Sequence, residues 1–329
     1  MGIKKVIKEY LPYSYMKKRR HDQKVDMLKQ QNEPLIYNEY GDVKRVFFLK
    51  DTLSQHTPYT FILGQNPDCI LWDRHNVGLP IHFYTHEAIF QETNKYARKK
   101  YGLLFESEAI RPNDFDRALD SPDIIKRFNK IFTFSERILE KYENALFAPA
   151  SGLWYGTEIN GGEIDPERYM KKDKNISVVA SNKQGSEYHR LRVAIAKEAI
   201  SLGLADGFGQ FCNNRIAKKA EGLDRYRYSI VVENDVTDLY FTEKIMDCFA
   251  SMTIPVYIGA RRIGDYFNAD GIIIIEPKDY NNIESVLKRC TKEDYESRIE
   301  AIKDNFERVK KFRCIEDYIY TNYKEEFVY

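Results

Sequence analysis

The chain has 329 residues, of which 43% are hydrophobic and 31% are charged, and its formal net charge is +1. This length accommodates two domains of ordinary size, and the near-neutral balance argues against a nucleic-acid-binding protein. No apolar run approaches the roughly 18–20 residues that a membrane-spanning helix requires, and the sequence predicts no signal peptide.

The first 42 residues form a basic segment. Positions 1–30 hold nine Lys and Arg residues against three acidic ones, with a basic cluster at 17–20. Apolar residues fall near helical spacing between positions 3 and 11. This segment is either a peripheral anchor on the inner, anionic face of the plasma membrane or a solvated basic leader.

Strand-like and helix-like pieces alternate between residues 43 and 146. Apolar runs predict strands at 43–49, 69–72, 81–84 and 102–105, with a further short run at 59–63. Helical patterns cover 88–100 and 134–143, and residues 124–132 carry both signals. The alternation predicts an α/β domain over 43–170.

Glycine and proline punctuate the passage from 147 to 175, which we interpret as a linker. These residues are Pro149, Gly152, Gly156, Gly161, Gly162 and Pro166.

The second half of the chain alternates more regularly. Strands are expected at 176–180, 206–211, 229–232, 253–258 and 271–275. Helices are expected at 188–202, from Thr242 onward, at 282–289 and at 295–309, with a helical end over 312–327. This order predicts a parallel sheet wound by helices. We therefore expect an α/β fold with two Rossmann-like domains, the second over 171–305, and a C-terminal helical tail over 306–329.

Five cysteines occur, at positions 69, 212, 248, 290 and 314. The number is odd and no C-x-x-C pair is present, so we expect free thiols in a reducing, cytoplasmic compartment.

Polar side chains concentrate between two apolar runs, from residue 226 to 259. A buried strand is followed by a polar segment, after which Thr242-Glu243-Lys244 opens a helix and a second strand ends at Gly259. The carboxyl end of a strand and the start of the next helix are where α/β proteins bind ligands. No G-x-G-x-x-G fingerprint occurs, which argues against an ordinary dinucleotide fold.

This stretch resembles the α-1,3-fucosyltransferase family, glycosyltransferase family ten. Glu233-Asn234, Tyr240, Thr242-Glu243-Lys244 and residues 254–259 follow the family order. One departure is Asp235, where many members have Ser. The resemblance implies a GT-B-type architecture, in which residues 43–170 form the acceptor side of a cleft and residues 171–305 bind the nucleotide sugar.

The resemblance also implies an activity. It is inverting, metal-independent transfer of fucose from GDP-fucose to a hydroxyl of a bacterial surface glycan. The glycan would be a polysaccharide, O-antigen or capsule, and it is either free or linked to a lipid. No cofactor is expected. Two alternatives stay open: the same fold using another nucleotide sugar, and a sugar- or nucleotide-binding protein without turnover.

Donor contacts are expected near the helix that opens at Thr242. Lys244 lies in the first turn, where the helix dipole disfavours a cation unless an anion is bound there; the alternative is a lysine that faces solvent. Glu243, which the resemblance places near donor hydroxyls, would otherwise only stabilise the first turn. The resemblance adds Asn234 and Tyr240 as neutral contacts, and Glu233 either binds ligand or holds the loop.

A phosphate-binding arginine and a general base complete the expected site. The resemblance places an arginine after a Ser-Asn segment, and we prefer Arg190 over Arg192 because Ser181-Asn182 precede it at the matching spacing. The base is expected after a strand of the first domain. Glu106 is the first choice and Glu108 the second; either could instead be a strand-end acid that faces water.

Two other patterns could suggest a metal. His82 and His86 with Glu87 are spaced for a helical site, but the surrounding residues predict a strand, and His86 could instead line the acceptor cleft. Asp114-Phe115-Asp116 spells D-x-D in a predicted loop, which is a weak match. We therefore expect no metal.

Overall fold

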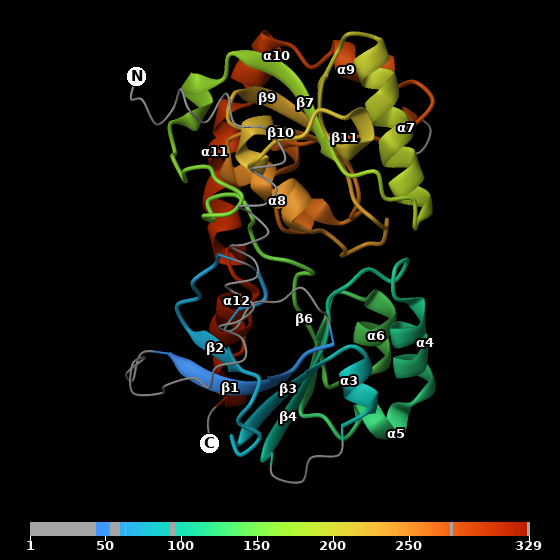
Figure 1. Cartoon of the computed structure of the whole chain (residues 1–329), viewed down its shortest axis with the longest axis vertical. Helices are drawn as coiled ribbons and strands as arrows, with labels where there is room; N and C mark the ends of the chain where they lie inside the picture. The colour runs from blue at the N-terminus through green and yellow to red at the C-terminus, as the bar shows by residue number, and fades with distance from the viewer. Residues whose placement is uncertain (1–43, 53–59, 63, 93–96, 277–278, 328–329) are drawn as a thin grey trace.

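The structure is a computed structural model that describes residues 44–52, 60–62, 64–92, 97–276 and 279–327. The basic segment at 1–42 lies outside these ranges. Within them the chain forms two lobes, each built on a parallel sheet (Figure 1).

The first lobe has its strands in the order β2-β1-β3-β4-β5-β6. The strands are β1 (Arg45–Lys50), β2 (Ile70–Asp73), β3 (Ile81–Thr85), β4 (Lys99–Leu104), β5 (Lys130–Thr133) and β6 (Ala145–Phe147). The helices are α3 (Glu87–Phe90), α4 (Pro112–Asp120), α5 (Pro122–Ile125) and α6 (Glu136–Lys141).

The second lobe has its strands in the order β11-β10-β9-β7-β8. They are β7 (Lys174–Ala180), β8 (Asp206–Gly209), β9 (Tyr226–Val232), β10 (Ile254–Ile258) and β11 (Ile273–Ile274). The helices that follow the linker are α7 (Glu187–Ser201), α8 (Glu243–Ala250), α9 (Ile283–Lys288), α10 (Lys292–Ser297), α11 (Ile299–Val309) and α12 (Ile315–Asn322).

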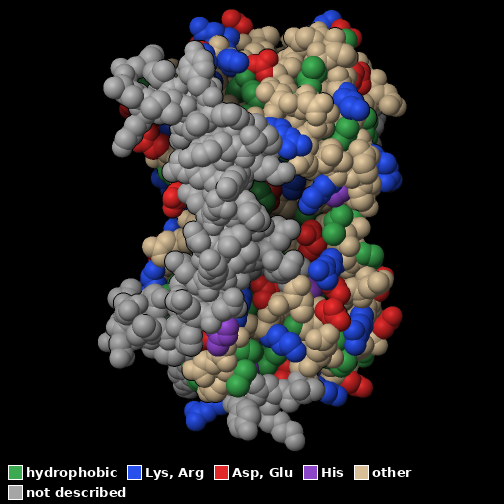
Figure 2. Space-filling model, viewed as in Figure 1, with side chains coloured by type: hydrophobic (Ala, Val, Ile, Leu, Met, Phe, Trp, Pro, Cys, Tyr) green, Lys and Arg blue, Asp and Glu red, His purple; other side chains and the backbone are tan. Residues whose placement is uncertain are grey.

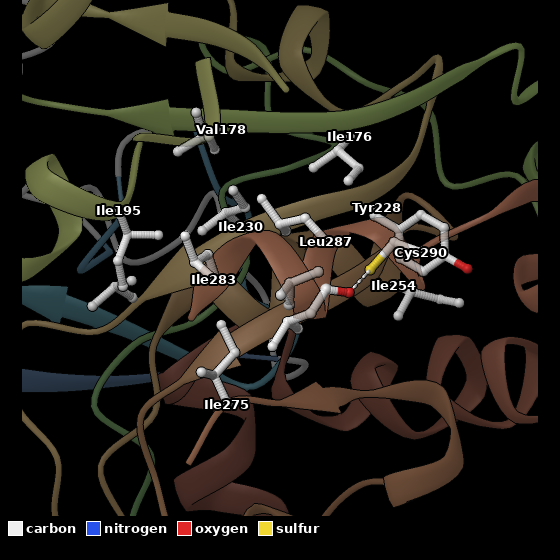
Figure 3. Close-up of a cluster of buried hydrophobic side chains, with 14 of the residues drawn as sticks. Ile176, Val178, Ile195, Tyr228, Ile230, Ile254, Ile275, Ile283, Leu287 and Cys290 are labelled. Atoms are coloured by element: carbon white, nitrogen blue, oxygen red, sulfur yellow. Dashed lines mark hydrogen bonds between the residues drawn. The ribbon is translucent and has the colours of Figure 1, made fainter. Parts of the chain in front are cut away.

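Aliphatic side chains fill the second lobe, since helices cover both faces of its sheet. Ile176, Ile230 and Ile254 come from three adjacent strands, and they pack against Ile195 of α7 and Leu287 of α9 (Figure 3). Both β9 and β10 are anchored in this core, which positions the ends of these strands and the polar loop that follows β9.

Most predicted elements are confirmed, but the helix expected at 88–100 is wrong. In the described part of this stretch, which leaves out residues 93–96, the chain forms only the short α3, and β4 begins at Lys99. Residues of β4 pair with both β3 and β5. Gly102 of β4 leaves room for Ile131 of β5, because a Cβ atom at position 102 would lie 2.5 Å from Ile131 Cδ1. Pairing with distant strands therefore overrides the local helical pattern.

Three smaller expectations also differ. Residues 60–62, the described part of the run at 59–63, form no strand. The single helix expected at 295–309 is two helices, because the chain breaks at Arg298 between α10 and α11. The D-x-D residues Asp114 and Asp116 lie on α4 and not in a loop.

The C-terminal segment returns to the first lobe (Figure 1). The expected start of the tail, residue 306, falls inside α11, and α12 packs beside β2. Glu316 is fully buried, and its Oε1 accepts from Phe61 N at 2.6 Å and from Trp72 Nε1 at 3.0 Å. Burial raises the pKa of this carboxyl to about 7. The end of the chain thus forms part of the first lobe's core.

Charged side chains of both signs are interspersed over both lobes on the face shown in Figure 2. Among the described residues, no helix is both long and apolar enough to cross a bilayer. All five cysteines lie within these residues and are free, which confirms the expectation of free thiols.

Candidate active site

The polar loop after β9 is organised by a buried carboxylate. Glu233 is 0% exposed, and its backbone N–H donates to Ile258 O at 2.9 Å, which extends the β9–β10 pairing by one residue. Its Oε1 accepts from Thr242 N at 2.9 Å, and its Oε2 accepts from Thr242 Oγ1 at 2.7 Å. Glu233 therefore fixes the residue that caps α8.

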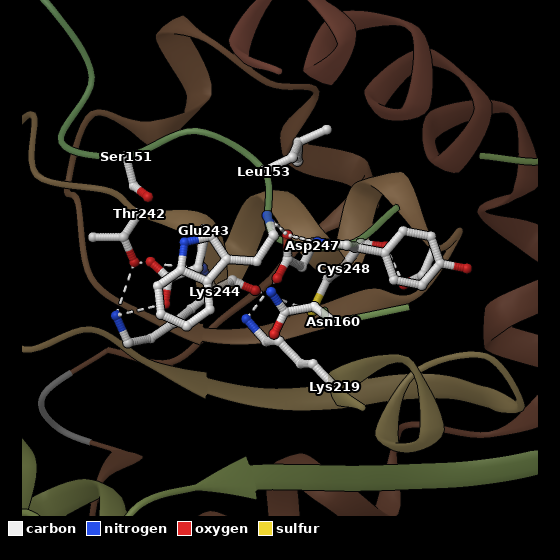
Figure 4. A network of polar contacts seen from close by, with 12 residues as sticks. Ser151, Leu153, Asn160, Lys219, Thr242, Glu243, Lys244, Asp247 and Cys248 are labelled. Carbon is white, nitrogen blue, oxygen red and sulfur yellow. Dashed lines mark hydrogen bonds and ion pairs between the residues drawn. The ribbon is translucent and has the colours of Figure 1, made fainter. Parts of the chain in front are cut away.

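Lys244 is held by the same carboxylate. Its Nζ donates to Glu233 Oε2 at 3.0 Å and to Thr242 Oγ1 at 2.8 Å (Figure 4). The side chain is 20% exposed, so the ammonium group is anchored without being enclosed. Of the two roles left open for Glu233, the structure supports holding the loop. Lys244 presents a cation at the N-terminus of α8, the end of the helix that carries the positive partial charge of the helix dipole.

Glu243 lies beside two lysines. Its Oε1 is 3.7 Å from Lys244 Nζ. Burial opposes ionisation of Glu243, but the charges of Lys244 and Lys219 and a hydrogen bond to Thr242 outweigh it, so its pKa lies below the usual value. The group is therefore a carboxylate at neutral pH, an acceptor suited to sugar hydroxyls.

Lys219 and Asp247 belong to this cluster, and neither was identified from the sequence. Lys219 Nζ lies 2.6 Å from Asp247 Oδ2 (Figure 4). Asp247 Oδ1 accepts from the backbone N–H groups of Trp154 and Tyr155 at 2.8 and 2.9 Å. This carboxylate thus joins the linker to α8. The available signal was its position four residues after Glu243, on the same helical face.

Asn234 meets the first turns of α7. Its Oδ1 accepts from His189 Nε2 at 3.0 Å and is 3.5 Å from Arg192 Nη1, and its backbone O accepts from Ser186 Oγ at 2.9 Å. Burial, with the nearby charge of Arg192, lowers the pKa of His189. The imidazole is therefore a neutral donor that orients Asn234.

Arg192, and not Arg190, reaches this loop. Arg192 is 7% exposed and donates to Ser181 Oγ at 3.2 Å; within the described residues its buried Nε has no hydrogen-bond partner. Arg190 is exposed, and its Nη1 donates to Gln184 O at 3.1 Å. Arg192 lies on the face of α7 that is buried, whereas Arg190 lies on the exposed side; which of the two binds phosphate stays a prediction.

The loop after β4 carries both candidate bases. Glu106 is half-buried, and its Oε1 accepts from Ser107 N at 2.9 Å. Glu108 accepts from Ser135 Oγ, and its Oε2 accepts from Arg137 Nε at 2.9 Å. Glu108 is thus paired with Arg137 within the first lobe, whereas the bond found for Glu106 among the described residues is to the backbone N–H of Ser107. Which of the two carboxylates is the base stays a prediction, with Glu106 as the first choice.

The loop after β9 contacts the first lobe directly. Asp235 Oδ2 accepts from Ala109 N at 2.9 Å, and Leu239 N donates to Glu136 Oε1 at 2.8 Å. Asp235, the departure from the family pattern, therefore ties the donor-side loop to the loop that carries Glu106.

Tyr240 is placed between the lobes and is only 2% exposed. Its ring packs on Phe134, with centroids 4.8 Å apart. Burial raises its pKa well above the usual value, and the charges of Glu233 and Glu106, from opposite lobes, add to the effect. The structure assigns Tyr240 a packing role in this contact and brings the two carboxylates to the same region.

The side chains that could suggest a metal have other partners. The ring nitrogens of His82 contact Tyr84 Oη at 2.9 Å and Leu79 O at 2.7 Å. His86 contacts Asp114, and Asp116 contacts Arg137. In the described ranges, no group of three or more His, Cys, Asp or Glu side chains is arranged to hold a metal ion.

Residues 169–299 match the family model described as glycosyltransferase family 10 (fucosyltransferase), C-term. These matched residues correspond to a family 10 glycosyltransferase domain. The match includes the stretch at 226–259 and confirms the resemblance seen there. It also spans the whole second sheet of the family 10 domain, from β7 to β11.

Two curated proteins are similar to this chain. The α-(1,3)-fucosyltransferase FucT of Helicobacter pylori is 29% identical over 203 residues, which are 55% of this chain and 41% of that protein. A putative fucosyltransferase-like protein of Arabidopsis thaliana is 30% identical over 124 residues, 36% of this chain and 23% of that protein. The chain thus spans less than half the length of these relatives.

Solved glycosyltransferase-like structures share the fold. Anabaena HepE, solved with UDP and glucose, has a TM-score of 0.51 at 9% identity and covers 86% of this chain and 100% of its own. A sucrose-phosphate synthase from Thermosynechococcus elongatus has a TM-score of 0.50 at 12% identity, covering 91% and 92%. These likenesses confirm the α/β, GT-B-type arrangement of the chain.

Proposed function

We propose that this chain transfers fucose from GDP-fucose to a glycan hydroxyl, with inversion and without a metal ion. The observation that carries the proposal is the anchoring of Lys244 at the start of α8 by Glu233 and Thr242. Lys244 and the buried Arg192 would neutralise the diphosphate, since cations and helix N–H groups stabilise phosphate oxygens. The ionised Glu243 and Asn234 would orient the donor.

The reaction follows from these positions. Glu106 takes the proton of the acceptor hydroxyl, whose oxygen then attacks the anomeric carbon of fucose on the face opposite the diphosphate. The carbon–oxygen bond to the phosphate breaks, and the charge that develops on GDP is stabilised by groups already in place. Attack from the opposite face inverts the anomeric centre.

The acceptor we propose is a bacterial surface glycan, free or lipid-linked, handled on the cytoplasmic side. This part of the proposal rests on the family 10 domain and on the relative from Helicobacter pylori. An assay of GDP release with and without added glycan acceptors tests turnover. A protein that binds GDP-fucose but releases no GDP with any acceptor would support the non-catalytic alternative.

GDP should bind this protein in the presence of a chelator. Because the proposed phosphate ligands are Lys244, Arg192 and the start of α8, EDTA should leave the affinity unchanged. At 100 times Kd, GDP should stabilise the fold by about 2.7 kcal/mol, which a thermal shift assay detects. UDP, ADP and CMP serve as controls. Protection by UDP alone would indicate another nucleotide sugar, and dependence on Mn²⁺ would contradict the proposal.

Arg192→Ala should weaken GDP binding, and Arg190→Ala should not. Loss of a hydrogen bond to a charged group costs about 1.5–3 kcal/mol, so titration calorimetry should show a 10- to 150-fold higher Kd for Arg192→Ala. Arg190 lies two residues away on the exposed side of α7 and provides the matched control. The reverse result would restore Arg190 as the phosphate ligand.

A further inference from the structure

His86 is a buried residue in an unusual place. It follows β3 directly, its ring is 0% exposed, and its backbone, with φ of 46° and ψ of −117°, lies in a region that non-glycine residues rarely adopt. Non-glycine residues adopt this region at a cost, and they do so where surrounding contacts hold them. The contacts of the imidazole therefore indicate the role of His86.

The ring of His86 binds the start of the loop that carries Glu106. Its Nε2 lies 3.1 Å from the backbone N of Phe105 and 3.1 Å from that of Glu106. Two N–H groups point at one nitrogen, so this nitrogen must accept and carries no proton. The proton is then on Nδ1, which donates to Asp114 Oδ2 at 3.0 Å.

Beyond the end of β4, the His86 imidazole accepts backbone N–H groups that a neighbouring strand would otherwise accept. β4 ends at Leu104, and the last backbone bond from β3 to it is His86 N to Leu103 O at 3.0 Å. The next two N–H groups of the loop have the imidazole as their acceptor. Asp114 fixes the tautomer that makes acceptance possible, in the way that a carboxylate commonly orients a functional histidine. The peptide before Glu106 is thus held from inside the first lobe.

We infer that His86, held in one tautomer by Asp114, is a positioning residue for Glu106. This inference rests on the proposed function, because the position of Glu106 affects turnover only if Glu106 is the base. The side chain of His86 touches no reacting atom. It sets the backbone at Phe105 and Glu106, and so the direction from which the carboxylate reaches the acceptor hydroxyl.

His82 provides a matched control on the same strand. It is also 0% exposed and also has both ring nitrogens engaged, but its partners are Tyr84 and Leu79. Neither partner belongs to the Glu106 loop. A purely structural role of a buried histidine predicts the same consequences for both positions.

The test compares His86→Asn with His82→Asn. Asparagine removes the ring, and its shorter side chain cannot reach the two loop N–H groups. For His86→Asn we expect kcat to fall by roughly 10–100-fold, the range for a displaced catalytic group, with unchanged Kd for GDP. For His82→Asn we expect lower thermal stability and a kcat within about twofold of wild type. His86→Gln, whose carbonyl reaches further, should restore part of kcat.

A double variant separates positioning from a general loss of structure. In a Glu106→Gln background, His86→Asn should lower the residual kcat no further, because its effect passes through the carboxylate. An equal loss in both backgrounds, or an unchanged kcat in His86→Asn, would overturn the inference. If Glu106→Gln keeps full kcat, the proposed base fails first and this inference fails with it.

One measurement needs no turnover. In ¹⁵N-labelled wild-type protein, the ring resonances lost in His86→Gln should be those of a neutral imidazole with its proton on Nδ1. A ring protonated on Nε2 would overturn the proposed arrangement even in a fully active enzyme.

Discussion

Glu106→Gln should lower kcat by roughly 10²–10⁴-fold, the range for loss of a general base. Glutamine keeps the shape of the side chain, and its carbonyl can still accept from Ser107 N, so the loop should keep its course. Affinity for GDP should stay near the wild-type value, since Glu106 belongs to the first lobe and the proposed phosphate ligands belong to the second. Initial rates at saturating donor and acceptor, with calorimetry for GDP, measure both effects.

Glu108→Gln is the control for this experiment. Its carboxylate is paired with Arg137, which also contacts Asp116 at 3.1 Å. We expect a modest loss of thermal stability and a kcat close to wild type. If Glu108→Gln is inactive and Glu106→Gln is active, the base lies two residues further along the loop. If both are active, the base comes from another element.

Lys244→Ala should raise the Kd for GDP by about 10- to 150-fold, which corresponds to about 1.5–3 kcal/mol for a hydrogen bond to a charged group. Turnover should fall as well, because the lysine would stabilise the charge that develops on the leaving diphosphate. The same change also affects the fold. Of the donors found in the described part of the chain, it leaves the fully buried Glu233 with the two of Thr242, and breaking a buried ion pair typically costs about 3–5 kcal/mol.

A second substitution separates these two effects. In Lys244→Ala combined with Glu233→Gln, the uncompensated charge is gone, so the melting temperature should recover toward wild type. Affinity for GDP should not recover, since the phosphate ligand is still missing. If affinity returned together with stability, Lys244 would act only by supporting the loop, and the proposed donor site would lose its main cation.

The unit from β9 to β10 was predictable because its signals are local. A buried strand, a polar loop, a Thr cap with an acid in the first turn and a second buried strand follow one another without a gap. Hydrophobic periodicity and capping chemistry act within a few residues. The family resemblance lies in the same residues, and the family 10 match at 169–299 confirms it.

The partners of the site residues could not be predicted in this way. Spacing favoured Arg190, but the face that α7 turns toward the sheet brings Arg192 to Asn234. Both Glu106 and Glu108 follow β4, and their contacts differ because Ser135 and Arg137 lie beside Glu108. Tyr240 fits the family pattern, yet its ring packs against Phe134 of the other lobe.

The sequence by itself determined the fold class, the second domain's order of strands and helices, and the stretch that carries Lys244, because these depend on the pattern of neighbouring residues. Tertiary structure alone decided which groups meet. His86 reaches the loop after β4 because β3 and β4 are adjacent in the sheet. Asp235 reaches Ala109 because the two lobes face each other there. Such contacts join residues 20 to 126 positions apart, a separation at which no local preference specifies a partner.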